Sequence, residues 1–312
     1  MADKLLKIIE RYDSIVVFGH INPDGDCYGS QVGIKELILA NYPTKRVYLT
    51  GRGQPQFFET LSKMDDVSDE LIKKSLAIIV DCSNAERCED QRCKDAAFQI
   101  KFDHHIEGNN PFKGPKILKT NKIAACEIIA EWAFKNKLII TEKAATALFL
   151  GIVTDSGRFM YDLANSRTFK NAAKLLDSGV DMPKLFDTLY QSSEDDLKLK
   201  KLIVSNYKTT ENGVIYAIIT QEGLKQTNIE HNKAAGSVNQ LGNIPEYPIW
   251  ATFTEYIDGK YRVELRSKTL PIQPLAVKYG GGGHANACGV TALDADELKS
   301  LINDLDALLG DK

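Results

Sequence analysis

The feature that most limits how this chain can fold is a series of short apolar runs, each followed by a segment of helical periodicity. The runs at 15–19 and 76–80 contain no charged residue and no alternation of polar and apolar positions. Such runs are typical of strands that are buried on both faces of a parallel sheet. Because the strands alternate with helices, we expect an α/β fold with a mostly parallel sheet flanked by helices.

The pattern can be converted into expected elements for residues 1–191. The predicted strands are 15–19, 47–50, 76–80 and 99–102. The predicted helices are 5–12, 28–40, 123–136, 142–153, 166–178 and 183–191. We assign these elements to a first domain, residues 1–191.

The pattern changes after residue 191. The polar and charged stretch 192–205 is predicted to be a helical linker. Beyond it we expect strands at 214–220, 249–256, 261–266 and 289–291, and a final helix at 294–309. Asp258-Gly259 is typical of a hairpin turn. Residues 206–312 are therefore expected to form a second, smaller α/β domain, with a cleft between the two domains.

The length, net charge and cysteine content of the chain indicate which kinds of substrate and cellular environment suit it. A chain of 312 residues is long enough for two domains, each with its own core. The net charge of −3 gives none of the basic excess with which proteins grip long nucleic acid. No apolar run is long enough to span a bilayer, no signal region is present, and six cysteines are too sparse for a disulfide scaffold. We expect a cytoplasmic protein that acts on small phosphorylated substrates, away from membranes and long duplexes, and leave a homodimer open.

Acidic residues and histidines gather where the predicted elements end. They are His20, Asp24, Asp26, Asp81, Asp103, His104, His105 and Asp155. In an open parallel sheet, ligands bind beyond the carboxyl ends of the strands, so these side chains are expected at one edge. A lone Asp after a strand is usually a turn or cap residue. Caps alone do not explain why three of the five histidines share this placement.

The mixture of imidazole and carboxylate groups indicates a metal site. Such ligands suit manganese, iron or zinc better than calcium. Four segments of the chain supply enough ligands for two ions. Two neighbouring ions can share a carboxylate, acidify a water molecule and neutralise charge on a phosphoryl group. The sequence therefore predicts a two-metal phosphoesterase.

Five strings of residues carry a resemblance to a known family. GHINPDGD (19–26), IIVDCS (78–83), FDHH (102–105) and GIVTDSGRF (151–159) resemble the four motifs of the DHH phosphoesterase superfamily. GGGGHANACG (280–289), together with Arg266-Ser267, resembles the C-terminal domain associated with it. The nanoRNase/pAp phosphatase-like proteins are the group that the whole chain resembles.

The resemblance implies two Mn²⁺ ions per chain, with Mg²⁺, Co²⁺ or Fe²⁺ as alternatives. The ligands of one ion would be His20, Asp24 and Asp81. The ligands of the other would be Asp26, Asp81, His104 and Asp155, so that Asp81 bridges the two. Asp103 would orient its neighbours, and His105 would face the scissile phosphate and stabilise charge there.

A substrate clamp is expected in the second domain. An arginine such as Arg266 can fork onto a phosphate, and Ser267 adds a hydroxyl donor. Gly281, Gly282 and Gly283 allow a ligand to approach the backbone closely, and His284 follows directly. The residues alone leave a flexible surface loop as the alternative, whereas the resemblance favours a clamp for a phosphate or a terminal nucleotide.

The expected substrates are short oligoribonucleotides (nanoRNA), linear dinucleotides such as pApA, and 3′-phosphoadenosine 5′-phosphate (pAp). The alternatives are a RecJ-like single-strand exonuclease, a family II pyrophosphatase and a catalytically inactive nucleotide sensor. The glycine-histidine string disfavours the pyrophosphatase, and the modest length and acidic balance disfavour the exonuclease. A sensor would be expected to lose ligands, and this chain keeps them all.

Overall fold

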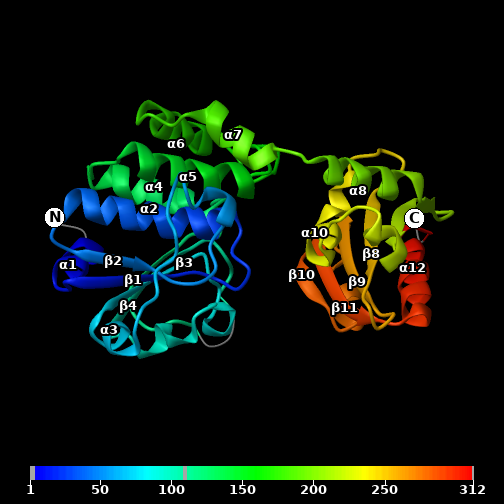
Figure 1. Ribbon diagram of the computed structural model, residues 1–312, viewed down its shortest axis with the longest axis horizontal. Coiled ribbons are helices and arrows are strands. Elements are labelled where there is room, and N and C mark those ends of the chain that lie inside the picture. Colours follow the sequence, from blue (N-terminus) through cyan, green and yellow to red (C-terminus); the bar gives the residue numbers. More distant parts are fainter. Residues whose placement is uncertain (1–3, 108–110, 311–312) are drawn as a thin grey trace. The chain divides into compact units, whose positions relative to one another are not determined.

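The computed structural model describes residues 4–107 and 111–310. The chain forms two compact units, residues 1–191 and 192–312, and each contains one β-sheet (Figure 1). No helix in the described ranges combines the length and apolar character needed to cross a membrane.

The first unit is built on a parallel sheet with the strand order β2-β1-β3-β4-β5. Its strands are β1 (Ser14–Phe18), β2 (Arg46–Leu49), β3 (Leu76–Val80), β4 (Phe98–Asp103) and β5 (Lys116–Leu118). Its α-helices are α1 (Lys4–Glu10), α2 (Gly25–Asn41), α3 (Asp69–Lys74), α4 (Ala125–Lys135), α5 (Glu142–Asp155), α6 (Ser166–Asp177) and α7 (Met182–Tyr190). Its 3₁₀ helices are η1 (Pro55–Phe57), η2 (Ala85–Arg87) and η3 (Gln91–Asp95). The predicted α/β class is confirmed; β5 and α3 went unpredicted because they are too short to show a period.

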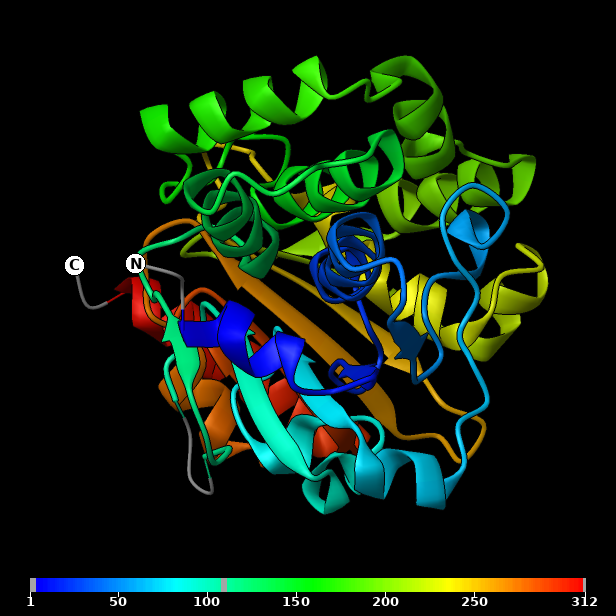
Figure 2. The same ribbon diagram turned by 90° about the vertical axis from the view of Figure 1, so that its left-hand side faces the viewer.

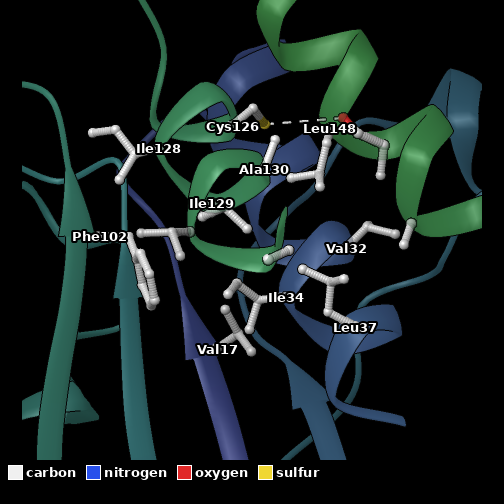
Figure 3. Close-up of a cluster of buried hydrophobic side chains, with 14 of the residues drawn as sticks. Val17, Val32, Ile34, Leu37, Phe102, Cys126, Ile128, Ile129, Ala130 and Leu148 are labelled. Carbon is white, nitrogen blue, oxygen red and sulfur yellow. Dashed lines mark hydrogen bonds between the residues drawn. The ribbon is translucent and has the colours of Figure 1, made fainter. Parts of the chain in front are cut away.

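Both faces of this sheet are covered, which explains the apolar runs. Ile15 and Val17 of β1 belong to the core formed with α2, α4 and α5, whereas Val16 and Phe18 belong to a second core that includes residues of α3 and η3. Figures 1 and 2 show α2 between the sheet and α5. Part of the first core, around Val17 and Phe102, is drawn in Figure 3. Alternate side chains of β1 therefore point into two different cores, which explains why its apolar run is unbroken.

A line of small residues lets α2 and α5 pack closely. The glycines that face α5 are spaced four residues apart, at Gly25, Gly29 and Gly33. An ideal Cβ at position 29 would lie 2.4 Å from the backbone oxygen of Ala147 in α5. The close approach brings the first turn of α2, with Asp26, beside the last turn of α5, with Asp155.

The second unit has a mixed sheet with the order β10-β11-β9-β8-β7-β6, in which β7 and β8 are parallel and the other neighbours antiparallel. Its strands are β6 (Tyr207–Thr209), β7 (Val214–Ile219), β8 (Ile249–Glu255), β9 (Tyr261–Ser267), β10 (Gly282–His284) and β11 (Ala287–Leu293). Its helices are α8 (Glu194–Ser205), α9 (Gln221–Lys225), α10 (His231–Ala235), η4 (Gly236–Leu241), α11 (Gln273–Lys278) and α12 (Ala295–Gly310). One core lies under α12, and the other lies under α8, α9, α10 and η4.

The helix expected in the stretch 192–205 is present as α8, and its Leu199 and Ile203 are buried in the core with β7. Gly282 and Gly283 of the glycine cluster begin the edge strand β10, at the place where the residues alone left a flexible surface loop as the alternative. A Cβ at Gly283 would lie 2.4 Å from the backbone oxygen of Ala287, so the missing side chain allows this tight pairing. The Asp258-Gly259 turn between β8 and β9 is confirmed.

The packing of α2 against α5 predicts unequal costs for two similar substitutions. Gly29→Ala should lower the free energy of unfolding by roughly 1–3 kcal/mol, because the backbone of α5 cannot move aside as a side chain can. Gly33→Ala is the control, since its Cβ would meet only the end of the Leu148 side chain. Denaturant titration of both variants measures the difference. Equal stability of the two would show that the helices can separate without cost.

Candidate metal centre

The carboxyl ends of the parallel strands meet at one edge of the first sheet, and the expected acidic and histidine side chains converge there. Nε2 of His20, after β1, lies 3.4 Å from Oδ2 of Asp81, after β3. Nε2 of His104, after β4, lies 3.3 Å from Oδ1 of the same aspartate. Asp155, at the end of α5, places Oδ2 at 3.3 Å from His104 Nε2. Asp81 therefore stands between two imidazoles that come from different strands.

Backbone carbonyl groups set the orientation of both imidazole rings. Nδ1 of His20 is 2.9 Å from the oxygen of Ile21, and Nδ1 of His104 is 3.3 Å from the oxygen of Lys122. A carbonyl oxygen can only accept, so each Nδ1 carries the proton. In the neutral ring the lone pair is then on Nε2, the atom that faces the carboxylates. This is the tautomer and arrangement found in metal-binding histidines.

Asp81 provides the clearest test of whether a cation fits. Its side chain is buried, and its Oδ1 atom lies 3.3 Å from Nε2 of His104 and 3.4 Å from Nδ1 of His105 without accepting a hydrogen bond of good geometry from the described residues. Its backbone is in the left-handed region, with φ at +51°, a conformation that costs energy for a residue with a side chain. A buried carboxylate oxygen without a donor is costly unless a cation satisfies it. The residues present therefore fit a metal ion.

Asp26 is held by the beginning of another helix. Its carboxylate accepts hydrogen bonds from the backbone N–H groups of Ala125 (2.7 Å) and Cys126 (2.9 Å), in the first turn of α4. The N-cap of that helix, Ala124, has no side chain that could cap it. Burial and the nearby charge of Asp81 raise the pKa of Asp26 to about 7. The carboxylate is fixed in place although its surroundings penalise its charge.

Asp24 has a structural role as well as a place in the constellation. Its Oδ1 caps α2 by accepting hydrogen bonds at 3.0 Å from the backbone of Asp26 and of Cys27, and it lies 3.8 Å from Nε2 of His20. Cys27 itself was not anticipated. Its buried thiol accepts a hydrogen bond from the backbone N–H of His20 at 3.2 Å. Burial raises the pKa of the Cys27 thiol to about 12, so it is neutral near pH 7.

The electrostatics of the cluster favour positive charge. Burial would lower the pKa of His104, but Asp81, Asp26 and Asp155 raise it to about 10. Burial alone would raise the pKa of Asp81, and the contacts with His104 and His20 hold it below its ordinary value. In the absence of a metal, protons on the histidines balance part of the carboxylate charge. Metal binding displaces such protons, so it is expected to strengthen as the pH rises.

A buried lysine supports His105. Oδ1 of Asp103 lies 2.9 Å from Nδ1 of His105, and Oδ2 lies 2.9 Å from Nζ of Lys101. Lys101 is almost fully buried and also donates to the backbone oxygen of Ser83 at 3.1 Å. The sequence does carry a signal for this pair: Lys101 interrupts an apolar strand two positions before Asp103, on the same face.

A second buried ion pair lies behind His104. Lys122, whose carbonyl orients His104, places Nζ 3.1 Å from Oε1 of Glu127 and also contacts Glu131. Glu127 is fully buried and accepts further hydrogen bonds from the backbone N–H of Ile123 and the side chain of Asn171. Lysine and glutamate are rarely buried unless they are paired. The pair holds the turn that presents the carbonyl to His104.

The expected clamp residues lie in the second unit. Arg266 donates to Glu264 and to the backbone oxygen of Leu265. The Ser267 hydroxyl donates to the oxygen of Leu270 and accepts from Asn286, so its proton is engaged within the unit. The expected Gly281 precedes the edge strand β10, which contains the expected Gly282, Gly283 and His284. The side chain of His284 lies outside the described part of the structure.

Known proteins share the two-domain organisation of this chain. Residues 14–152 match the DHH family, N-terminal domain, and residues 211–311 match the DHHA1 domain. The chain is 36% identical to the probable bifunctional oligoribonuclease and PAP phosphatase NrnA of Streptococcus mutans, over 98% of each chain. It is 33% identical to the Bacillus subtilis bifunctional oligoribonuclease and PAP phosphatase NrnA, over 99% of this chain and 98% of the relative.

A solved structure shares the fold. The exopolyphosphatase-related protein from Bacteroides fragilis superimposes with a TM-score of 0.87 at 23% identity, covering 98% of this chain and 96% of that one. The chain belongs to the DHH phosphoesterase family and is nanoRNase-like. It is accordingly a hydrolase that acts on phosphate esters.

The buried pair behind His104 generates a prediction about metal affinity. Glu127→Gln should weaken metal binding by about ten- to a hundredfold, as loss of groups that orient a ligand does elsewhere. Lys119→Met is the control, because Lys119 pairs with Glu131 at the exposed end of the same network. Isothermal titration of the metal-free proteins measures the affinity, and thermal unfolding reports on the fold. Unchanged affinity in Glu127→Gln would mean that the pair serves stability alone.

Proposed function

We propose that this chain is a manganese-dependent phosphoesterase that uses two metal ions to hydrolyse short oligoribonucleotides, linear dinucleotides such as pApA, and pAp. The observation that carries the proposal is the buried Asp81 carboxylate, shared by imidazoles from two different strands. The names of the Streptococcus and Bacillus relatives, which combine oligoribonuclease and PAP phosphatase, support the choice of substrate.

The donor atoms support two ions. In each of three groups of residues the candidate ligand atoms lie within 4.8 Å of one another: His20 with Cys27 and Asp81, Asp81 with His104 and His105, and Asp26 with His104 and Asp155. Asp24 is in none of these groups, but its Oδ1 lies 3.8 Å from Nε2 of His20. One ion would be held by His20, Asp24 and Asp81. The other would be held by Asp26, Asp81, His104 and Asp155. The mixture of imidazole and carboxylate suits Mn²⁺, with Fe²⁺, Co²⁺ and Mg²⁺ as alternatives.

The bound ions would acidify a water molecule and neutralise charge on the phosphoryl group. The side chains around them would position the substrate and move protons. Asp103 fixes the ring of His105 through the contact at Nδ1, so His105 would stabilise charge at the leaving group. Lys101 neutralises Asp103 and keeps its carboxylate available as an acceptor. Although burial favours the neutral acid, His105 and Lys101 hold the pKa of Asp103 below its ordinary value.

The second unit would bind one end of the substrate. The strand register places Arg266 of β9, Ala287 of β11 and position 284 of β10 in one row across the sheet. Residues paired in this way share a face of the sheet. Arg266 would bind a phosphate on this face, and Ser267 would hold the end of the strand in place. A clamp with one phosphate-binding arginine, on a chain of net charge −3, suits a short substrate better than a long strand.

A substrate panel tests the proposal. With Mn²⁺, the protein should hydrolyse pApA, pAp and RNA of a few nucleotides, and Asp81→Asn should abolish all three activities because it weakens both ion sites. Metal analysis of Asp81→Asn should show fewer than the two ions per chain expected of the unsubstituted protein. Asp13→Asn, at an exposed position before β1 and outside the cluster, is the control with the same change of charge. Normal turnover by Asp81→Asn, with both ions retained, would refute the two-metal arrangement.

A second test separates binding of the substrate from chemistry. Arg266→Ala should lose about ten- to a hundredfold in rate on pApA, because it removes hydrogen bonds to a charged group. The loss on bis-p-nitrophenyl phosphate, a small reactive ester, should be slight. Lys268→Ala, with an exposed side chain on the same segment, is the control. Metal content should stay the same in both. Equal losses of Arg266→Ala on the two substrates would argue against a clamp.

A further inference from the structure

One acidic side chain lies in the middle of the basic face of β9. Oε1 of Glu264 is 2.9 Å from Nη2 of Arg262, and Oε2 is 3.3 Å from Nη1 of Arg266. Arg262 is held from the other side by the side-chain oxygen of Asn232, at 3.0 Å. Positions 262, 264 and 266 share a face because strand side chains alternate. The proposed phosphate clamp therefore includes a carboxylate directly beside its arginine.

The space next to this carboxylate is bordered by two glycines. In the strand register, Glu264 pairs with Gly289 of β11, which pairs in turn with Gly282 of β10. A Cβ at Gly289 would lie 3.7 Å from Oε1 of Glu264, an ordinary contact, and a Cβ at Gly282 would meet nothing within 4 Å. Both glycines are half-buried. The contacts within the chain thus do not require either residue to be glycine, and a ligand can approach Glu264 over them.

A carboxylate in a phosphate site has an electrostatic cost, because it repels the anion that the site binds. Its contact with Arg266, at 3.3 Å, is longer than the roughly 2.7–2.9 Å of a charge-assisted hydrogen bond. Oε2 of Glu264 therefore retains the capacity to accept a further donor. In a nucleotide, the neutral donors nearest to a phosphate are the hydroxyl groups of the sugar. A phosphate bound by Arg266 would bring its own sugar close to Glu264, whose Oε2 is 3.3 Å from that arginine.

We infer that Glu264 is a specificity-determining residue that accepts a hydrogen bond from the 2′-hydroxyl of the bound nucleotide and so favours ribonucleotides over deoxyribonucleotides. Carboxylates recognise this hydroxyl in dinucleotide-binding proteins, and it is the group that distinguishes RNA from DNA. The inference rests on the proposed function, because it requires that the clamp of the second unit binds a nucleotide.

The first test compares the hydrolysis of pApA with that of its 2′-deoxy counterpart. The unsubstituted protein should prefer the ribonucleotide by about ten- to a hundredfold in kcat/KM, the usual effect of a hydrogen bond to a charged group. Glu264→Ala should bring the ratio close to one. Arg262→Ala, which retains the carboxylate, should keep the preference. If Glu264 only holds the arginines, Glu264→Ala will slow both substrates equally, and an unchanged ratio overturns the inference.

A binding measurement makes the result independent of catalysis. Calorimetry with 5′-AMP and 2′-deoxy-5′-AMP should show tighter binding of the ribonucleotide to the unsubstituted protein and equal binding to Glu264→Ala. The near-isosteric Glu264→Gln should fold normally and lose part of the preference. Equal affinity of the unsubstituted protein for the two nucleotides contradicts the inference, even if pApA is hydrolysed. Failure of the proposed function would show differently, as absence of pApA hydrolysis.

Discussion

The rest of the first unit depends on one unfavourable arrangement, the burial of several carboxylates around Asp81. Burying like charges together is costly unless cations, hydrogen bonds or dipoles compensate for them. The chain supplies part of the compensation itself. The first turn of α4 donates to Asp26, and Lys101 pairs with Asp103. The oxygen of Asp81 without a hydrogen-bond donor is where this compensation stops. A metal ion bound there would complete the balance and would couple the stability of the site to its loading.

The hydrophobic packing also helps to hold the buried carboxylates together. The glycines of α2 allow α5 to approach so closely that Asp155 reaches the cluster formed by the strand ends. The strands themselves are fixed by cores on both faces of the sheet. Because each side chain of the cluster is attached to a rigid element, little conformational entropy remains to be lost on binding. The left-handed backbone conformation of Asp81 costs energy locally, and the surrounding packing stabilises it.

The sequence allowed much of this to be predicted, for identifiable reasons. Unbroken apolar runs identified the buried strands. The acidic residues that follow these runs in the sequence could then be predicted to lie together, because the carboxyl ends of parallel strands meet at one edge of the sheet. The supporting contacts could not be predicted in the same way. The carbonyl groups that orient His20 and His104 are backbone atoms, which no residue type reveals. No residue type or spacing shows that Glu127 and Lys122 are buried, or that α8 packs into the core of the second unit, since burial depends on packing between distant segments.

The glycine-rich edge strand β10 has a consequence for solubility. A sheet edge exposes backbone donors and acceptors that can template the addition of a strand from another chain, and proteins often block such edges with charges or proline. Glycine provides a different protection, because it weakens a strand and offers no side chain for cross-strand packing. An edge of this kind can stay open to a small ligand while remaining a poor starting point for aggregation.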